Sequence, residues 1–135
     1  MSNNRSVLRF NKYIVERVVF EANEDYFSDV EDKELPFDFD TNTTFIDNRL
    51  EIELSAIIFK NAVKNNYPFE MQVVLKGFFE VENGGDIRAF EMNAIAILFP
   101  YLRAIVSTYT ANSNVVPVLL PAMNINAYLK KKYEQ

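Results

Sequence analysis

In residues 50–58, LEIELSAII, every second side chain is apolar, with two glutamates and a serine at positions between them. Residues 69–81, FEMQVVLKGFFEV, repeat this alternation. A period of two places neighbouring side chains on opposite faces of an extended strand, so each stretch predicts a strand covered on one face. The Asn and Pro residues of the intervening segment, 60–68, favour a turn. The two strands are therefore predicted to form an antiparallel hairpin.

Two further strands are predicted before this hairpin. Leu8–Phe20 is long and rich in Ile, Val, Tyr and Phe, with apolar side chains on both faces toward its end. Leu35–Thr41 is short, and its apolar and charged side chains alternate. Because Pro36 has no N–H group to donate, it favours an edge strand or the start of a strand. After residue 81 the run ENGGD, 82–86, predicts a turn that ends the sheet.

The last third of the chain changes period. Apolar side chains recur at three- and four-residue steps over Phe90–Thr110, as on a helix. Ala111–Asn126 holds two prolines among many apolar residues, so it must either plug a core or line an apolar groove. Ile125–Tyr133 predicts a terminal helix. Residues 1–135 are thus predicted to form one α+β domain, in which a four-stranded antiparallel sheet is followed by a long helix, an apolar connecting loop and a short C-terminal helix.

The long predicted helix carries two apolar stripes rather than one. The first stripe includes Ala94, Leu98, Tyr101 and Ile105, and the second lies beside it. A helix that is apolar on two sides needs two surfaces to bury against. One is its own sheet, and the other is predicted to be another copy of the chain, so we expect an oligomer.

Composition excludes most catalytic chemistry. The chain has no Cys, no His and only three Gly, which removes thiol and imidazole groups, the usual transition-metal ligands and glycine-rich phosphate loops. We therefore expect no enzyme activity, no cofactor and no metal. The remaining acid–base candidates are the pairs Asp38/Asp40 and Glu51/Glu53, which are more typical of the solvent face of a strand.

Charge constrains the partners. A net charge of -5 argues against nucleic acid, which needs a clustered basic surface. Residues 21–40 hold nine of the 19 acidic side chains, which predicts either a solvated loop or a docking surface for a basic partner. No apolar run of signal-peptide or membrane-spanning length occurs, so we expect a cytoplasmic protein with no direct membrane insertion.

Aromatic content indicates a binding role. Twelve Phe and seven Tyr are more than one short pair of helices can cover, and exposed aromatic side chains need a compensating use. Binding the apolar segments of other polypeptides is such a use.

Several short motifs resemble those of the SecB protein-export chaperone family. They are ILFPYLR at 97–103, Pro117, LLP at 119–121, Asn124 and Ala127, preceded in the same order by FEA at 20–22 and FDFDT at 37–41. The likeness spans about residues 8–130.

The resemblance implies a cytosolic holdase that keeps unfolded preproteins export-competent and passes them to the SecA motor. The family's homotetramer is a dimer of dimers whose long helices are sandwiched between the dimers. By this resemblance Ala94, Leu98, Tyr101 and Ile105 are expected at the oligomer contact.

The resemblance also implies a client groove between the sheet and the connecting loop. Carried onto matching positions, the client-binding residues are Leu35, Phe37 and Phe39 of the sheet, Leu119 and Leu120 of the loop, and Ile125, Tyr128 and Leu129 of the last helix. Tyr26 and Phe27 fall in the family's aromatic stretch and join this set.

The sequence departs from the family at the acidic surface that meets SecA. Glu21 keeps one acidic position, whereas Arg17 replaces an acid, Gln72 is neutral where an acid is expected, and Glu70 replaces an apolar residue. The leading hypothesis is an ATP-independent holdase. Its alternatives are a SecB-like chaperone that guards the antitoxin of a toxin–antitoxin pair, a carrier of small apolar ligands, and an enzyme built on Asp38 and Asp40.

Overall fold

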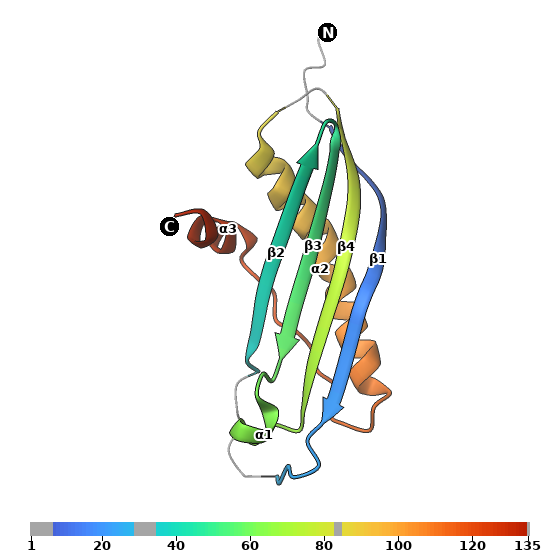
Figure 1. Ribbon diagram of the computed structural model, residues 1–135, viewed down its shortest axis with the longest axis vertical. Coiled ribbons are helices and arrows are strands. Elements are labelled where there is room, and N and C mark those ends of the chain that lie inside the picture. Colours follow the sequence, from blue (N-terminus) through green and yellow to red (C-terminus); the bar gives the residue numbers. More distant parts are fainter. Residues whose placement is uncertain (1–6, 29–34, 83–84, 135) are drawn as a thin grey trace.

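The computed structural model describes residues 7–28, 35–82 and 85–134. In these residues four strands and three helices follow in the order β1 (Val7–Ala22), β2 (Phe37–Ile46), β3 (Arg49–Ile58), α1 (Ala62–Asn65), β4 (Phe69–Glu82), α2 (Ile87–Ala111) and α3 (Ile125–Tyr133). The strands form one antiparallel sheet, α2 runs across one of its faces, and α3 lies beside β2 (Figure 1). The predicted α+β architecture is confirmed.

The order of strands in the sheet is β1-β4-β3-β2. The predicted hairpin of β3 and β4 occupies the centre, where Leu54 lies opposite Leu75. On its outer side β3 pairs with β2, so that Leu54 also lies opposite Thr41. β1 and β2 are therefore the two edges of the sheet.

The alternation in β3 and β4 separates a buried face from a half-buried one, as predicted. The inner-face side chains of both strands have almost no exposed surface; they are Leu50, Ile52, Leu54, Ala56, Ile58, Phe69, Met71, Val73, Leu75, Phe79 and Val81. They form one apolar cluster with the buried side chains of α2. Burial of this face against α2 is the main apolar contribution to folding.

Two bulges change which side chains of β1 face the core. The register of β1 with β4 shifts between Phe10 and Lys12 and again between Val15 and Arg17. Each bulge inserts an extra residue, so the side chains that face α2 no longer fall at every second position. Phe10, Tyr13 and Phe20 consequently all pack against the core.

β2 is longer than the predicted strand Leu35–Thr41 and continues to Ile46. A two-residue turn joins it to β3, and Asp47 adopts a left-handed φ of 53° there. The polar run NTT at 42–44 hid this extension, because it breaks the apolar alternation. The predicted turn at 60–68 contains the short helix α1, flanked by Asn61 and Asn66 with positive φ.

Helix α2 buries a different set of side chains from the predicted first stripe. Ala94 and Leu98 have no exposed surface because they lie against the protomer's own sheet, so the expected contact with another copy cannot include them. Tyr101 is 37% exposed and Ile105 is half-buried, which leaves these two for a second chain. By length and composition alone α2 could span a membrane, but a core helix passes the same test, and here it packs on the sheet.

Gly77 sets how closely α2 approaches β4. A Cβ atom on Gly77 would lie 2.6 Å from both methyl groups of Leu98 and 2.9 Å from the Phe79 ring.

We predict that Gly77→Ala lowers the free energy of unfolding by about 1–3 kcal/mol, because a methyl group must be forced into a packed core. Urea denaturation measures this. The outer-face change Gln72→Ala should stay within about 0.5 kcal/mol of the parent protein, and equal losses for the two variants would contradict the packing argument.

Candidate functional site

The middle of the segment between α2 and α3 is tied to α2 by hydrogen bonds. Ser107 Oγ donates to the Val118 carbonyl at 3.1 Å, the Val118 N–H donates to Thr110 Oγ1 at 2.9 Å, and Arg103 Nε donates to the Leu120 carbonyl at 3.0 Å. These bonds hold the loop extended against the helix. Of the two sequence alternatives, plugging a core or lining a groove, this loop has features of both.

Side chains of this loop alternate between the core and solvent. Val118 is 8% exposed and Leu120 is fully buried, whereas Leu119 is 70% exposed and Val116 is 85% exposed. Burial contributes little to folding at a Leu or Val that is 70–85% exposed. The loop therefore presents apolar side chains on an ordered backbone.

Phe39 of β2 lies between α2 and α3. Its ring contacts Phe99 of α2 with centroids 5.8 Å apart and Tyr128 of α3 with centroids 5.1 Å apart, both edge to face. Phe39 is half-buried and packs on the core. Helix α3 thus covers one of the side chains that the resemblance assigns to client binding.

Polar contacts hold α3 on the exposed edge of β2. Tyr128 Oη lies 3.0 Å from Thr41 Oγ1 and donates to Asp40 Oδ1 at 3.2 Å. Lys132 Nζ donates to the backbone carbonyl of Thr41 and, at 2.9 Å, to its Oγ1. Burial raises the pKa of Tyr128, and the charge of Asp40 raises it further. β2 is an edge strand, and its Thr41 carbonyl accepts this hydrogen bond from Lys132 instead of one from a neighbouring strand.

A second polar cluster joins α3 to the start of α2. The buried Glu91 accepts hydrogen bonds from Thr43 Oγ1 of β2 and, at 2.7 Å, from Tyr133 Oη. The Arg88 guanidinium lies 3.7 Å from the centre of the Tyr133 ring. Burial, together with the hydrogen bond to Glu91 and its charge, raises the pKa of Tyr133 to about 12.

The predicted client-binding residues fall into three groups. Leu120 and Leu129 are core residues with no more than 5% exposure, so they support the site rather than contact a partner. A half-buried set packs against the same core cluster: Leu35, Phe37, Phe39, Ile125 and Tyr128. Leu119, Tyr26 and Phe27 are exposed. The exposed Val116 is not among the residues predicted from the sequence, although its place in the apolar loop was a signal.

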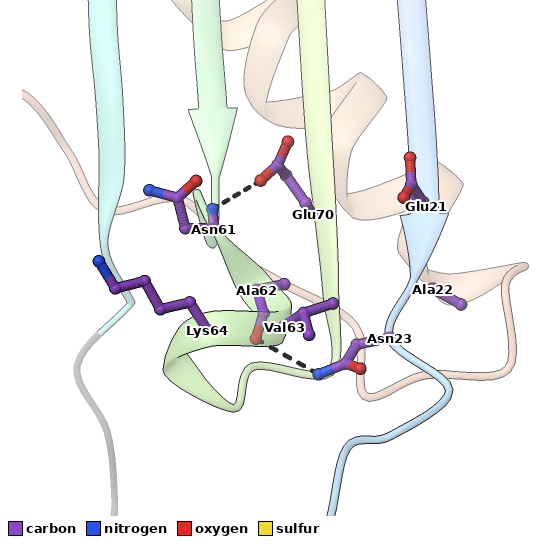
Figure 2. A pocket seen from close by; sticks show the side chains of 8 residues that line it. All are labelled: Glu21, Ala22, Asn23, Asn61, Ala62, Val63, Lys64 and Glu70. Carbon is purple, nitrogen blue, oxygen red and sulfur yellow. Dashed lines mark hydrogen bonds between the residues drawn. The ribbon is translucent and has the colours of Figure 1, made fainter.

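The predicted docking residue Glu21 lies at the far end of β1, opposite Glu70 of β4. Both line a pocket of about 360 Å³ near α1, where Glu70 Oε1 accepts a hydrogen bond from the Asn61 N–H at 2.6 Å (Figure 2). Two acidic side chains therefore line one pocket at this end of the sheet. The acidic residues of the predicted docking surface at 29–34 lie outside the described residues.

Ion pairs and one carboxyl pair cover the outer face of the sheet. Lys76 Nζ lies 3.1 Å from Glu51 Oε1. Glu53 shares a hydrogen bond with Glu16 of β1, and this bond, burial and the like charge of Glu16 raise the pKa of Glu53. The two like charges of this pair come from different strands, β3 and β1.

None of the described residues forms a cluster of three or more acidic, His or Cys side chains able to hold a metal ion. Asp38 and Asp40 are exposed, and they face Lys60 Nζ at 3.9 Å and Tyr128 Oη respectively. This arrangement excludes no reaction by itself, but it assembles no shared acid–base pocket.

A second apolar surface lies between β1 and the outer side of α2. It forms an open hollow of about 420 Å³ lined by Tyr13, Tyr101, Ala104, Ile105, Thr108, Tyr109 and Asn112. Tyr13 stacks on Tyr101 with centroids 4.4 Å apart. The lining is mostly apolar and partly exposed, as expected for a surface that another chain covers.

Comparison with known proteins points to one family. The family model described as preprotein translocase subunit SecB matches residues 2–135. An uncharacterised protein of Methanocaldococcus jannaschii, MJ0357, is 37% identical over 127 residues, which are 90% of this chain and 81% of that protein.

Two solved structures share the fold. The SecB-like chaperone Rv1957 of Mycobacterium tuberculosis, in complex with a ChAD peptide from the HigA1 antitoxin Rv1956, superposes with a TM-score of 0.62 at 13% identity, covering 86% of this chain and 90% of that one. A Streptococcus agalactiae protein of unknown function gives a TM-score of 0.54 at 11% identity, covering 87% and 99%.

The raised pKa of Glu53 predicts a pH dependence of stability. Because the folded protein holds this proton more tightly than the unfolded chain does, the stabilisation is present at low pH. It is lost as pH rises above about 4, where an unperturbed Glu ionises. We predict that Glu53→Gln flattens this fall and stabilises the protein at pH 7 by less than about 1 kcal/mol, given solvent screening.

Urea denaturation across pH 3–8, about the range over which carboxyl groups titrate, measures the effect. Glu51→Gln is the matched control, because it breaks the contact with Lys76 and should not stabilise the protein at pH 7. A Glu53→Gln variant no more stable at pH 7 than the parent protein would count against repulsion between Glu16 and Glu53.

Proposed function

The chain belongs to the SecB family of preprotein translocase subunits, and from this premise we propose that it is an ATP-independent holdase that binds unfolded polypeptides. SecB-family chaperones are not enzymes and bind unfolded peptides. The finer proposal is that the clients of this chain are preproteins, which it keeps export-competent in the cytoplasm.

The observation that carries this proposal is the ordered apolar loop after α2. Leu119 and Val116 are exposed at 70% and 85% while three hydrogen bonds to α2 hold the backbone around them. A loop already ordered loses little conformational entropy when it binds a client. Non-directional apolar contacts accept many client sequences.

The half-buried side chains beside the loop extend the proposed client surface. Phe39 and Tyr128 form its aromatic part, and Leu35, Phe37 and Ile125 lie around the same core cluster. Leu120 and Leu129 act beneath it by filling the core. No observation favours a small-ligand carrier, because Leu98 already fills the space between α2 and the sheet at Gly77.

We further propose that a second copy of the chain covers the hollow between β1 and α2. Tyr101 and Ile105 are the two predicted contact residues that are not fully buried within the protomer, and they line this hollow together with Tyr13. This association is a step toward the homotetramer, a dimer of dimers, that the family resemblance implies.

We propose two alternative partners for this chaperone, the SecA motor and an antitoxin. Export would use the exposed Glu21 as part of a docking surface for SecA. The second candidate is protection of an antitoxin, favoured by the fold shared with Rv1957, whose structure holds an antitoxin peptide. Affinity capture from the native cytosol separates them, because export predicts SecA together with preproteins, and antitoxin protection predicts one small protein.

We predict that the purified protein suppresses aggregation of a chemically denatured client at near-stoichiometric amounts without nucleotide.

The double variant Val116→Ser/Leu119→Ser should bind a fluorescently labelled unfolded client about tenfold more weakly, since each lost apolar contact is worth about 0.7 kcal/mol. Both positions are exposed, so the melting temperature should not change.

The control is Val63→Ser, which removes a 68% exposed apolar side chain from α1, at the end of the sheet away from α3 (Figure 1). Absence of any client binding by the parent protein would refute the holdase function. Equal weakening by Val63→Ser would show that the loop has no special role.

A prediction for the oligomer uses Ala104, which is exposed on α2 and lines the hollow. Ala104→Glu introduces a charge that a contact with a second copy would bury, so we expect a smaller mass by light scattering. The helix itself tolerates Glu well. Ala127→Glu, exposed on α3, should leave the mass unchanged. An unchanged mass for Ala104→Glu would place the oligomer contact elsewhere.

A further inference from the structure

We propose that Asn66 is a positioning residue that holds Phe27 in a fixed orientation, so that its exposed ring contacts an apolar side chain of a bound client. This inference rests on the proposed holdase function. It assigns a role to a residue outside the sheet and the connecting loop, where the predicted client groove lies.

Asn66 binds the backbone of Phe27 with both ends of its side-chain amide. The Phe27 N–H donates to Asn66 Oδ1 at 3.1 Å, and Asn66 Nδ2 donates to the Phe27 carbonyl at 3.1 Å. The amide thus satisfies the donor and the acceptor of one residue, as a neighbouring strand would do. Asn66 adopts a left-handed backbone with φ of 53°, a conformation that Asn tolerates better than most residues.

The chain on the other side of Phe27 is anchored by Asn23. This buried side chain donates from Nδ2 to the Tyr67 carbonyl at 2.9 Å and to the Ala62 carbonyl at 3.3 Å, the second bond being drawn in Figure 2. Its Oδ1 accepts from the Asp25 N–H at 3.0 Å, and its carbonyl accepts from the Tyr26 N–H at 3.1 Å. Residues 23–27 are therefore fastened to the α1 region at both ends.

This ordered backbone carries an unburied ring. Phe27 is 65% exposed and does not belong to the core cluster of the described residues, and Tyr26 beside it is 41% exposed. Folding gains little from such a ring, yet four hydrogen bonds from Asn23 and Asn66 hold the segment in place. An ordered aromatic anchor binds more tightly than a mobile one, because less entropy is lost on contact.

The occupant of this position is an apolar side chain of an extended client. Contact with a single ring is non-directional, which suits clients of many sequences.

A double-mutant cycle tests the assignment. Phe27→Ala should weaken binding of a fluorescently labelled unfolded client about fivefold, as expected for part of the contact area of one ring. Asn66→Gly removes both hydrogen bonds and keeps the left-handed backbone. It should weaken binding about threefold, mainly through faster dissociation. The variant carrying both changes should bind like Phe27→Ala alone, because the proposed effect of Asn66 on client binding passes through the Phe27 ring.

Controls separate this role from general effects. Val63→Ala removes an equally exposed apolar side chain from α1 and should bind like the parent protein. Additive effects of the two changes, no effect of Asn66→Gly, or equal weakening by Val63→Ala would overturn the assignment. A change of oligomeric mass in Phe27→Ala would also overturn it, since the ring would then contact another copy. If the parent protein binds no client, the proposed function fails first; if it binds and Phe27→Ala matches it, only this inference fails.

Discussion

Helix α2 lies on the sheet at the one inner-face position of β4 that has no side chain. Gly77 lets the methyl groups of Leu98 reach the strand, and this close approach fixes where the rest of α2 lies. Ser107, Thr110 and Arg103 then face the connecting loop and bind its backbone. The contact between Leu98 and Gly77, on the sheet-facing side of α2, therefore helps to set where Val116 and Leu119 are exposed on the loop.

Much of the fold could be predicted because the buried faces of β3 and β4 repeat with a period of two over long stretches. The strand β1 was also predicted, but its faces were not, since its two bulges change the period at positions that only the partner strand reveals. The assignment of Ala94 and Leu98 to an oligomer contact failed for a related reason. Periodicity identifies two apolar stripes on α2, but it does not say which one the sheet covers.

The candidate site could be predicted where a short motif carries it and not where distant residues meet. The resemblance nominated Leu119 and Phe39 for client binding, and the structure shows that α3 covers Phe39 through Tyr128. The bond of Lys132 to the Thr41 carbonyl joins residues 91 apart, and those of Asn66 to Phe27 join residues 39 apart. Such polar side chains carry no periodic signal, so only the fold brings them together.

The cap that Lys132 places on Thr41 bears on how many copies can add to the sheet. A sheet with two open edges can be extended by strand pairing without limit, which is how fibres grow. Here the β2 edge is interrupted by α3, whereas α2 contacts β1, the other edge strand, through the ring pairs Tyr13–Tyr101 and Phe20–Tyr109. Pairing through β1 would use up the open edge of both copies at once. Growth by strand addition would then stop at two, a useful property for a protein whose proposed partners are unfolded chains.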